Sequence, residues 1–162
     1  MTEALSIRFA TREDVPIIFS FIKALADYEK LSHEVVASES DIDHSLFGAP
    51  QGQPEVILAR LNGKDVGFAL FFHNYSTFLG RKGIYLEDLF VLPEYRGKGV
   101  GKNLLSRLAA IAVERDCGRL EWSVLDWNTP SIEFYKSLHA EAMDEWTVYR
   151  LTGDALKNLS QL

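Results

Sequence analysis

A glycine-rich loop between a strand and a helix constrains the fold of this chain more than any other feature. Residues 89–105 read LFVLPEYRGKGVGKNLL: an apolar run that ends at Pro93, then glycines at 97, 99 and 101, then a helical pattern. Glycines leave backbone N–H groups uncovered, and the first turn of a helix presents its own N–H groups at the same place. The segment therefore predicts a backbone cradle for an anion such as a phosphate.

Two common nucleotide-binding motifs do not fit this spacing. A mononucleotide P-loop needs Ser or Thr after Gly101-Lys102, where Asn103 stands, and a glycine where Arg96 stands. A dinucleotide fingerprint that begins at Gly97 needs a third glycine at position 102. An isolated glycine cluster is equally compatible with a flexible turn, but the strand-loop-helix context and the neighbouring cations favour an anion site.

The remaining patterns predict an α/β (α+β) fold with one mixed sheet. The Asn62-Gly63 dipeptide predicts a tight hairpin turn, and a strand-helix-strand order in the second half implies a parallel crossover. Thr11 and Asp14 are spaced as a capping box at the start of the first helix. The predicted strands cover residues 5–9, 84–92, 119–126 and 146–151, with two more within 55–75. The first predicted helix ends near Tyr28. Further helices are predicted at about 41–47, at about 100–115, after Pro130 and from Gly153.

Length and composition exclude several classes of protein. A length of 162 residues suits one domain, and 47% hydrophobic residues can form a sizeable core. The net charge is -6, from 17 Lys and Arg against 23 Asp and Glu, which is the wrong sign for binding a nucleic-acid backbone. An acidic surface instead favours cationic partners such as amines.

The cysteine count and the apolar runs predict a cytoplasmic protein with no membrane partner. Cys117 is the single cysteine, so internal disulfides are excluded. The N-terminus lacks the unbroken apolar stretch of an export signal, and no apolar run approaches the ~18 residues that span a bilayer. The four histidines show no metal-ligand spacing, and we expect no metal.

At Arg96-x-x-Gly99-x-Gly101 the chain resembles the GNAT superfamily of acyl-CoA-dependent N-acetyltransferases. It is most similar to the spermidine/spermine (diamine) N-acetyltransferases and above all to the thialysine N-ε-acetyltransferase group. The segments that carry the resemblance are ADYEKLS (26–32), YLEDLFVLPEYRGKGVG (85–101) and LDWNTPSIEFYK (125–136). The resemblance implies a single GNAT domain over residues 1–162, with a twisted, mostly antiparallel sheet of about six to seven strands whose central splay holds acyl-CoA.

The resemblance implies acetyl-CoA as the acyl donor. The glycine loop would bind the diphosphate, backbone groups of the preceding strand would pair with the pantetheine amides, and the turn around position 130 would contact the pantetheine arm. The implied cofactor-binding residues are Leu89, Phe90, Val91, Arg96, Gly97, Lys98, Gly99, Val100, Gly101, Lys102, Asn128, Pro130, Ser131 and Tyr135.

Acetyl transfer to an amine needs a base, because an alkylammonium with a pKa near ~10.4 is almost fully protonated at neutral pH. Alternation along residues 84–92 places Glu87 on one face and Asp88 on the other, together with Leu86 and Phe90. An acid among apolar neighbours costs burial energy unless it is paired or functional. Glu87 is thus a candidate base, or a carboxylate that reaches solvent or pairs with an Arg. The resemblance favours the base, acting directly or through water, and leaves Asp88 a supporting or structural residue.

Tyr135 lies where related enzymes keep a tyrosine as general acid. A phenol with a pKa near 10 can protonate the leaving thiolate, whose conjugate acid has a pKa near 8.5. The alternative is a core aromatic, since Ile132, Tyr135 and Leu138 share a helical stripe. Cys117 lies far along the chain from these segments, so we expect it to be inert and the amine to attack acetyl-CoA directly in a ternary complex.

The resemblance places Tyr28 and Glu29 beside the amine, and Glu121, Trp122 and Ser123 on the substrate side. Polyamine acetyltransferases carry an acidic residue and a Trp in the loop that matches 75–80, whereas this chain has Ser76 and Phe78. The predicted substrate is therefore a small primary amine, either a lysine-like amino acid or a short di- or polyamine.

The sequence leaves two alternative functions open. A non-catalytic CoA-binding regulatory module and an acetyltransferase of protein N-termini or lysines are the alternatives. By resemblance we expect a homodimer. His139 occupies a helix exit where relatives usually have Gly, at a position that favours a positive φ.

Overall fold

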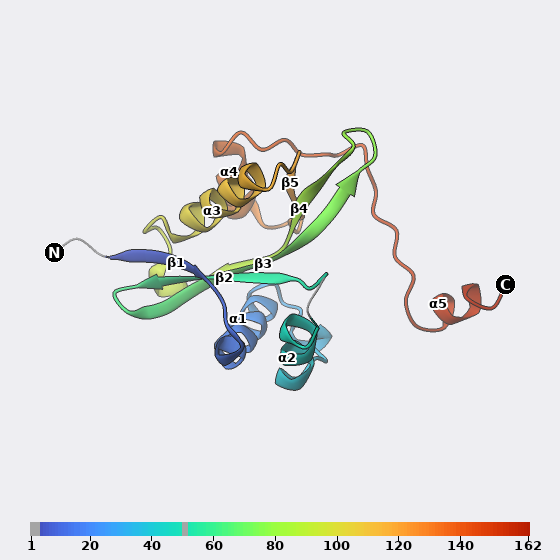
Figure 1. Cartoon of the computed structure of the whole chain (residues 1–162), viewed down its shortest axis with the longest axis horizontal. Coiled ribbons are helices and arrows are strands. Elements are labelled where there is room, and N and C mark those ends of the chain that lie inside the picture. Colours follow the sequence, from blue (N-terminus) through green and yellow to red (C-terminus); the bar gives the residue numbers. More distant parts are fainter. Residues whose placement is uncertain (1–3, 50–51) are drawn as a thin grey trace. The chain divides into compact units, whose positions relative to one another are not determined.

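The computed structural model describes residues 4–49 and 52–162. The chain forms two compact units, Met1–Ser123 and Val124–Leu162. The first unit holds the sheet and three helices, and the second holds two short helices (Figure 1). Each unit is described by itself below.

The sheet of the first unit has five strands in the order β1-β2-β3-β4-β5. Neighbouring strands are antiparallel except β4 and β5, which are parallel. This mixed, mostly antiparallel sheet confirms the predicted fold class, with five strands in place of six to seven. The strands are β1 (Leu5–Phe9), β2 (Glu55–Leu61), β3 (Lys64–Ser76), β4 (Arg81–Val91) and β5 (Leu120–Trp122).

The turn between β2 and β3 is the tight hairpin that the Asn62-Gly63 dipeptide predicts. Both residues have positive φ values, 50° at Asn62 and 83° at Gly63. Such a turn matches the twist of the two strands that it joins. The register of β2 and β3 next to the turn is therefore set locally by these two residues.

Helices cover the two faces of the sheet (Figure 1). α1 (Val15–Tyr28) and α2 (Glu39–Phe47) lie on one face and α3 (Val100–Glu114) on the other. On the α1 face, the ring of Phe21 stacks on Phe68 at 5.6 Å between centroids and lies 6.2 Å from that of Phe90. All three side chains are buried, and burial of each such ring stabilises the fold by about 2–3 kcal/mol. This core packs the middle of α1 against β3 and β4.

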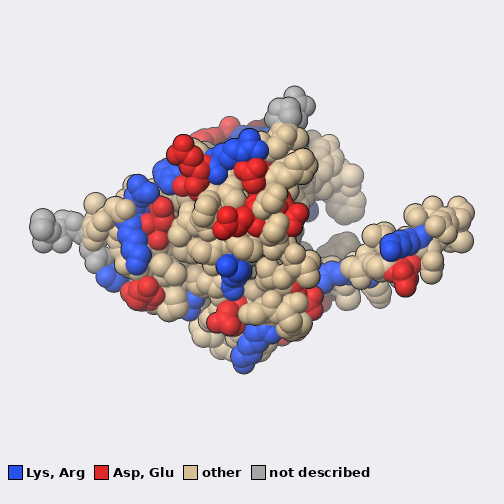
Figure 2. All heavy atoms as spheres, turned by 90° about the horizontal axis from the view of Figure 1, so that it is seen from below, with Lys and Arg blue, Asp and Glu red and all other residues tan. Residues whose placement is uncertain are grey.

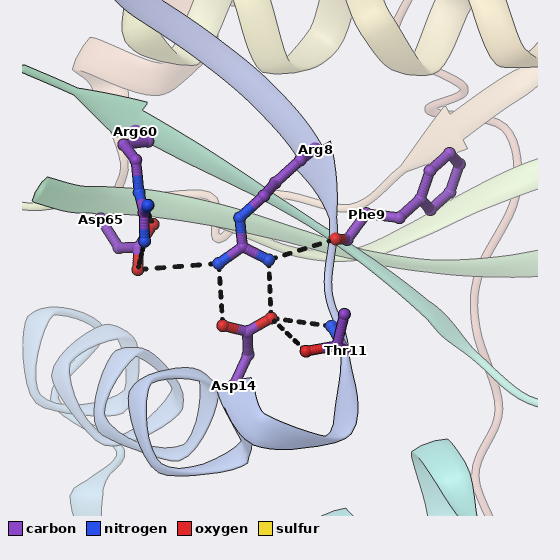
Figure 3. A network of polar contacts seen from close by, with 6 residues as sticks. All are labelled: Arg8, Phe9, Thr11, Asp14, Arg60 and Asp65. Carbon is purple, nitrogen blue, oxygen red and sulfur yellow. Dashed lines mark hydrogen bonds and ion pairs between the residues drawn. The ribbon is translucent and has the colours of Figure 1, made fainter. Parts of the chain in front are cut away.

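An ion-pair network ties β1 to the start of α1 (Figure 3). The Arg8 guanidinium donates to both carboxylate oxygens of Asp14 at 2.7 and 2.8 Å. The Thr11 N–H donates to the same carboxylate at 2.7 Å, which confirms the predicted capping box at a 3-10 turn just before α1. The hydrogen bonds from Arg8, foremost, and from Thr11 lower the pKa of Asp14 to about 2.

The second unit contains α4 (Thr129–Ser137) and α5 (Gly153–Leu159), as predicted. His139 follows α4 with a φ of 63°, and the Ala140 N–H donates back to the Tyr135 carbonyl at 3.2 Å. The left-handed helix exit expected at His139 is confirmed, although the residue is not glycine.

Two strand predictions are corrected by the structure. The segment 146–151 forms no strand, because a strand needs a hydrogen-bonded neighbour and no described strand pairs with it. Its apolar side chains are exposed, Val148 by 83% and Tyr149 by 92%. The strand predicted at 119–126 is shorter, Leu120–Trp122, because its pairing with β4 stops there.

The surface carries both acidic and basic side chains. Acidic and basic side chains are interspersed over the face seen from below in Figure 2, with no continuous basic stripe on that face. Among the described residues, no helix has the length and apolar character that crossing a lipid bilayer requires.

Candidate active site

β5 pairs with only part of β4. They pair at three positions, of which the last joins Leu86 to Trp122. β4 continues to Val91, so residues 87–91 have no strand partner on this side within the described chain. Because β5 is the edge strand of the described sheet, the central splay that the resemblance implies stays a prediction.

Two residues of β4 turn their backbone groups towards this unpaired side of the strand, which we call the opening. The Leu92 N–H donates to the Val66 carbonyl beside β3, at 2.8 Å. Successive residues of a strand direct their backbone groups to alternate sides. Leu89 and Val91 therefore direct theirs away from β3, into the opening, whereas Phe90 directs its backbone groups towards β3.

A β-bulge at Glu87 changes the faces that the neighbouring residues occupy. Phe71 of β3 lies opposite Leu86, yet the adjacent Leu70 lies opposite Asp88, so Glu87 is an extra residue in β4. Since Leu70 and Phe71 point to opposite faces, Leu86 and Asp88 do as well. The prediction that Leu86 and Asp88 share a face is wrong, because simple alternation does not extend through a bulge.

Asp88 is half-buried on the face that α1 covers. Two of its neighbours there are Leu70 and Phe90. Phe90 belongs to the core cluster around Phe21, and Leu70 packs against that cluster. Burial, and then the negative charges of Glu87 and Glu29, raise the pKa of Asp88 to about 6. No hydrogen bond or ion pair reaches this carboxyl group from any other described residue. A carboxyl group with a pKa near neutrality is suited to proton transfer at physiological pH.

The end of α1 adds a second source of negative charge. Tyr28 is the last residue of α1, and Glu29 follows it as the C-cap. Burial raises the pKa of Glu29, and the Glu29 charge contributes to the shift at Asp88. Glu87 is exposed. The end of α1 and the bulge of β4 thus concentrate carboxyl groups in one place, which favours a cation.

The glycine loop adopts the backbone conformation that its sequence requires. Gly97 and Gly99 have φ values of 77° and 81°, where a side chain would be strained. Gly99 is the N-cap of α3, and no side chain in the described part of the chain caps this helix. The first N–H groups of α3, from Val100 to Lys102, therefore lie uncapped at the positive end of a 15-residue helix. This end fits an anion, as predicted.

Arg96 contacts protein groups beside the loop. Its guanidinium lies over the Tyr28 ring, 4.8 Å from the centroid, and over the Phe90 ring, 5.4 Å from the centroid. Its Nε donates to the Val91 carbonyl at 2.9 Å. The residue that opens the loop thus contacts both the end of α1 and β4.

The predicted substrate residues of β5 lie at the other end of the opening. Glu121 pairs with Tyr85 in the sheet and accepts a hydrogen bond from the Asn74 side chain at 3.3 Å. The hydroxyl groups of Tyr85 and Ser123 lie 2.7 Å apart. Trp122 is half-buried at the last paired position. Among described residues, no group of His, Cys, Asp or Glu could hold a metal ion.

The profile of the acetyltransferase (GNAT) family matches residues 22–140 of this chain. The chain belongs to this family. It is an N-acetyltransferase that uses acetyl-CoA.

Curated relatives match the GNAT chain over nearly its whole length. It is 35% identical to an L-ornithine N5-acetyltransferase of Arabidopsis thaliana, with 96% of this chain and 88% of the relative covered. It is 36% identical to a thialysine N-ε-acetyltransferase of Bos taurus, with 95% and 96% covered.

Solved structures share the fold. An integron cassette protein of V. cholerae has a TM-score of 0.79 at 29% identity, with 98% of each chain covered. An aminoglycoside N-acetyltransferase solved with CoA has a TM-score of 0.74 at 19% identity, with 93% of this chain and 97% of that chain covered.

The described residues fit acetyl-CoA at two places. The uncapped start of α3 and its glycine loop fit the diphosphate. The outward backbone groups of Leu89 and Val91 fit amide partners such as those of pantetheine. When bound, acetyl-CoA supplies the activated acetyl group.

The other predicted cofactor residues and the predicted acid belong to the second unit. Asn128 is buried and caps α4, where its Oδ1 accepts from the Ser131 N–H at 3.4 Å. Pro130 occupies the first turn, where its missing N–H leaves no bond unmade. Tyr135 lies on α4 with its ring 5.7 Å from that of Phe134. The assignments of these residues to the cofactor, and of Tyr135 to proton transfer, remain predictions.

Sequence reasoning missed the importance of Asp88. Periodicity alone treats Glu87 and Asp88 alike, because the bulge that exposes the first and buries the second depends on the register with β3. The adjacent pair of carboxylates in a strand of apolar residues was the available indication, since a bulge often lies beside an active site.

Proposed function

We propose that this GNAT enzyme transfers the acetyl group of acetyl-CoA to a primary amine of a small cationic substrate. The candidates are an ornithine- or lysine-like amino acid, thialysine included, and a short di- or polyamine. The observation that carries the proposal is the pKa of Asp88, raised to about 6 by burial beside Glu87 and Glu29. A bound ammonium group would stabilise the negative charges of these neighbouring, unpaired carboxyl groups. The ornithine and thialysine acetyltransferases to which the chain is similar support the same substrate class.

Reaction begins with the loss of a proton from the ammonium group. We assign this proton to Glu87, directly or through water, because Glu87 is exposed at the bulge beside the opening. Asp88 is the second candidate, since its pKa lies closer to neutrality than that of an ordinary carboxyl group. The neutral amine then attacks the thioester carbon, and Leu89 or Val91 can offer a backbone N–H to the developing oxyanion.

On acetyl transfer the carbon–sulfur bond would break and the acetylated nitrogen would lose its second proton, which would leave the amide and a CoA thiolate. We assign the proton that this thiolate receives to the Tyr135 hydroxyl, as the resemblance implies. Tyr28, Glu29, Glu121, Trp122 and Ser123 are proposed to bind the amine substrate. We propose one GNAT domain over residues 1–162, and the family profile, which matches residues 22–140, supports it.

We also propose that the enzyme is a homodimer. Support comes from the segment 146–151 in the second unit, which is rich in aromatic and β-branched residues and has no strand partner in the described structure. Large apolar side chains exposed in a row commonly mark a surface that another chain covers. A second copy of this chain is the proposed partner.

Steady-state acetylation assays test the proposed substrate class. Acetyl-CoA is held saturating while ornithine, lysine, thialysine, putrescine, spermidine and a peptide with a free N-terminus are compared. We expect the highest kcat/KM for one of the small amines, and Tyr135→Phe should lower kcat with little change in acetyl-CoA binding. Turnover of the peptide alone would replace this proposal by a protein acetyltransferase.

A further inference from the structure

We propose that Arg96 is a positioning residue that couples the cofactor loop to the amine side of the site. This inference rests on the proposed function and assigns Arg96 a role other than direct contact with the diphosphate. It follows from where the guanidinium lies. The next residue, Gly97, begins the turn into α3, while the Arg96 side chain reaches back to α1 and β4.

Three contacts hold this side chain. The planar guanidinium lies over the Tyr28 ring at 4.8 Å and over the Phe90 ring at 5.4 Å. At the same time Nε donates to the Val91 carbonyl at 2.9 Å. Phe90 is buried in the core and cannot yield easily. Arg96 is therefore anchored on its β4 side and presents its other contact to Tyr28.

Tyr28 is the partner of Arg96 on α1. It is the last residue of α1, half-buried, and the chain leaves the helix directly after it. Glu29 follows, and its charge acts on Asp88. A contact that holds the Tyr28 ring therefore also holds the neighbouring carboxyl group of Glu29, which is proposed to face the amine.

Binding at the loop and binding at the end of α1 are then linked. A diphosphate on the amides of residues 97–102 orders the loop and with it the backbone of Arg96. An ordered Arg96 holds Tyr28 and Glu29 in the orientation that binds the amine. Because such a coupling is reciprocal, acetyl-CoA should raise the affinity for amine by the same factor by which amine raises the affinity for acetyl-CoA.

Lysine cannot replace arginine in this role. An ammonium group keeps the charge, but it cannot stack a planar surface on Tyr28 while an adjacent N–H bonds the Val91 carbonyl. Arg96→Lys therefore separates the positioning role from a purely electrostatic one. Lys98→Gln is the matched control, since it removes a cation from the same loop, and Lys98 lies over the ring of Tyr95, at 6.0 Å.

The first measurement compares amine KM with the dissociation constant of acetyl-CoA. We expect Arg96→Lys to raise amine KM about fivefold and to change the acetyl-CoA dissociation constant less than twofold. Lys98→Gln should show the opposite pattern. In a Tyr28→Leu background, Arg96→Lys should add less than twofold to amine KM. If Arg96→Lys weakens acetyl-CoA binding and leaves amine KM unchanged, Arg96 is a ligand of the cofactor and the proposal is wrong.

The second measurement needs no turnover. Hydrogen exchange in the absence of amine should show that CoA slows exchange at residues 97–103 and also at 26–31 in the wild-type chain. In Arg96→Lys the protection at 97–103 should remain and that at 26–31 should be lost. Protection at 26–31 that persists in Arg96→Lys contradicts the coupling. A wild-type chain that shows both protections yet acetylates no amine contradicts the proposed substrate and leaves the coupling intact.

Discussion

Asp88 of β4 lies opposite Leu70 of β3, on the face of the sheet that α1 covers. This pairing places a carboxyl group among apolar side chains, just beyond the point where β5 stops pairing with β4. The bulge that precedes it leaves Glu87 exposed. The bulge therefore gives two adjacent carboxyl groups different environments. Different environments are one way in which a site obtains groups of different proton affinity.

Asp88→Asn should change the pH dependence of stability. The folded-state pKa of about 6 lies above the ordinary value of 3.8, so the folded chain holds a proton that the unfolded chain releases. The contribution of Asp88 to stability is thus fully present below pH 4 and is lost as the pH rises to 6. Above pH 7 we expect Asp88→Asn to be more stable than the wild type by about 2 kcal/mol in urea unfolding.

The exposed Asp144 supplies the control for this measurement. Asp144→Asn should follow the wild-type stability curve throughout. A constant difference between Asp88→Asn and the wild type from pH 4 to pH 7 would show that Asp88 titrates normally.

Glu87→Gln and Asp88→Asn should separate the proton acceptor from its neighbour. If Glu87 is the base, Glu87→Gln should lower kcat/KM about 100-fold or more. Asp88→Asn should then lower kcat/KM less, because its carboxyl group does not take the proton. The pH profile of kcat/KM measures both effects. A larger loss in Asp88→Asn, with its limb near pH 6 abolished, would reverse the two roles.

Asp14→Asn should destabilise the chain and change its response to acid. The pKa of Asp14, about 2, lies below the ordinary 3.8, so its contribution is present above pH 4 and is lost as the pH falls to 2. We expect a loss of about 1 kcal/mol at pH 7 once solvent screening is allowed for. Asp43 receives two similar bonds from Arg12, at 2.7 and 2.8 Å, but lies at the surface. Asp43→Asn should therefore change the free energy of unfolding in urea little. An equal loss of stability in Asp14→Asn and Asp43→Asn would show that burial of the carboxyl group does not matter.

The exposed segment 146–151 should control assembly. We expect the wild-type chain to be a dimer by light scattering and the double variant Trp146→Ser, Tyr149→Ser to be a monomer with unchanged helix content. Val36, exposed by 92% in the first unit, provides a control for the loss of a lone apolar side chain. Val36→Ser should remain dimeric. A monomeric wild type would contradict the proposed role of the segment.

The sequence predicted the elements whose causes are local. The Asn62-Gly63 turn, the capping box at Thr11 and the glycine loop each follow from the chemistry of a few adjacent residues, and all are present. Helical periodicity likewise located α1 and α3, because each buries one apolar face.

The features that escaped prediction depend on distant parts of the chain. The bulge at Glu87 exists only in register with β3. The segment 146–151 has the composition of a strand, but composition does not supply a partner. The motif identified Arg96 as part of the loop, whereas its contacts with Tyr28 and Val91 arise only when α1 and β4 are brought together. Long-range pairing therefore sets the details of the site, while local sequence sets its location.

Calorimetric titration with acetyl-CoA tests most directly whether the glycine loop binds the cofactor. Gly99 and Gly63 have nearly equal φ values, 81° and 83°, so alanine strains both turns alike, but Gly63 belongs to the β2–β3 hairpin. We predict that the wild type and Gly63→Ala bind one acetyl-CoA per chain with equal affinity and that Gly99→Ala binds at least tenfold more weakly. Equal binding by all three proteins, or no binding by the folded wild type, would contradict the account.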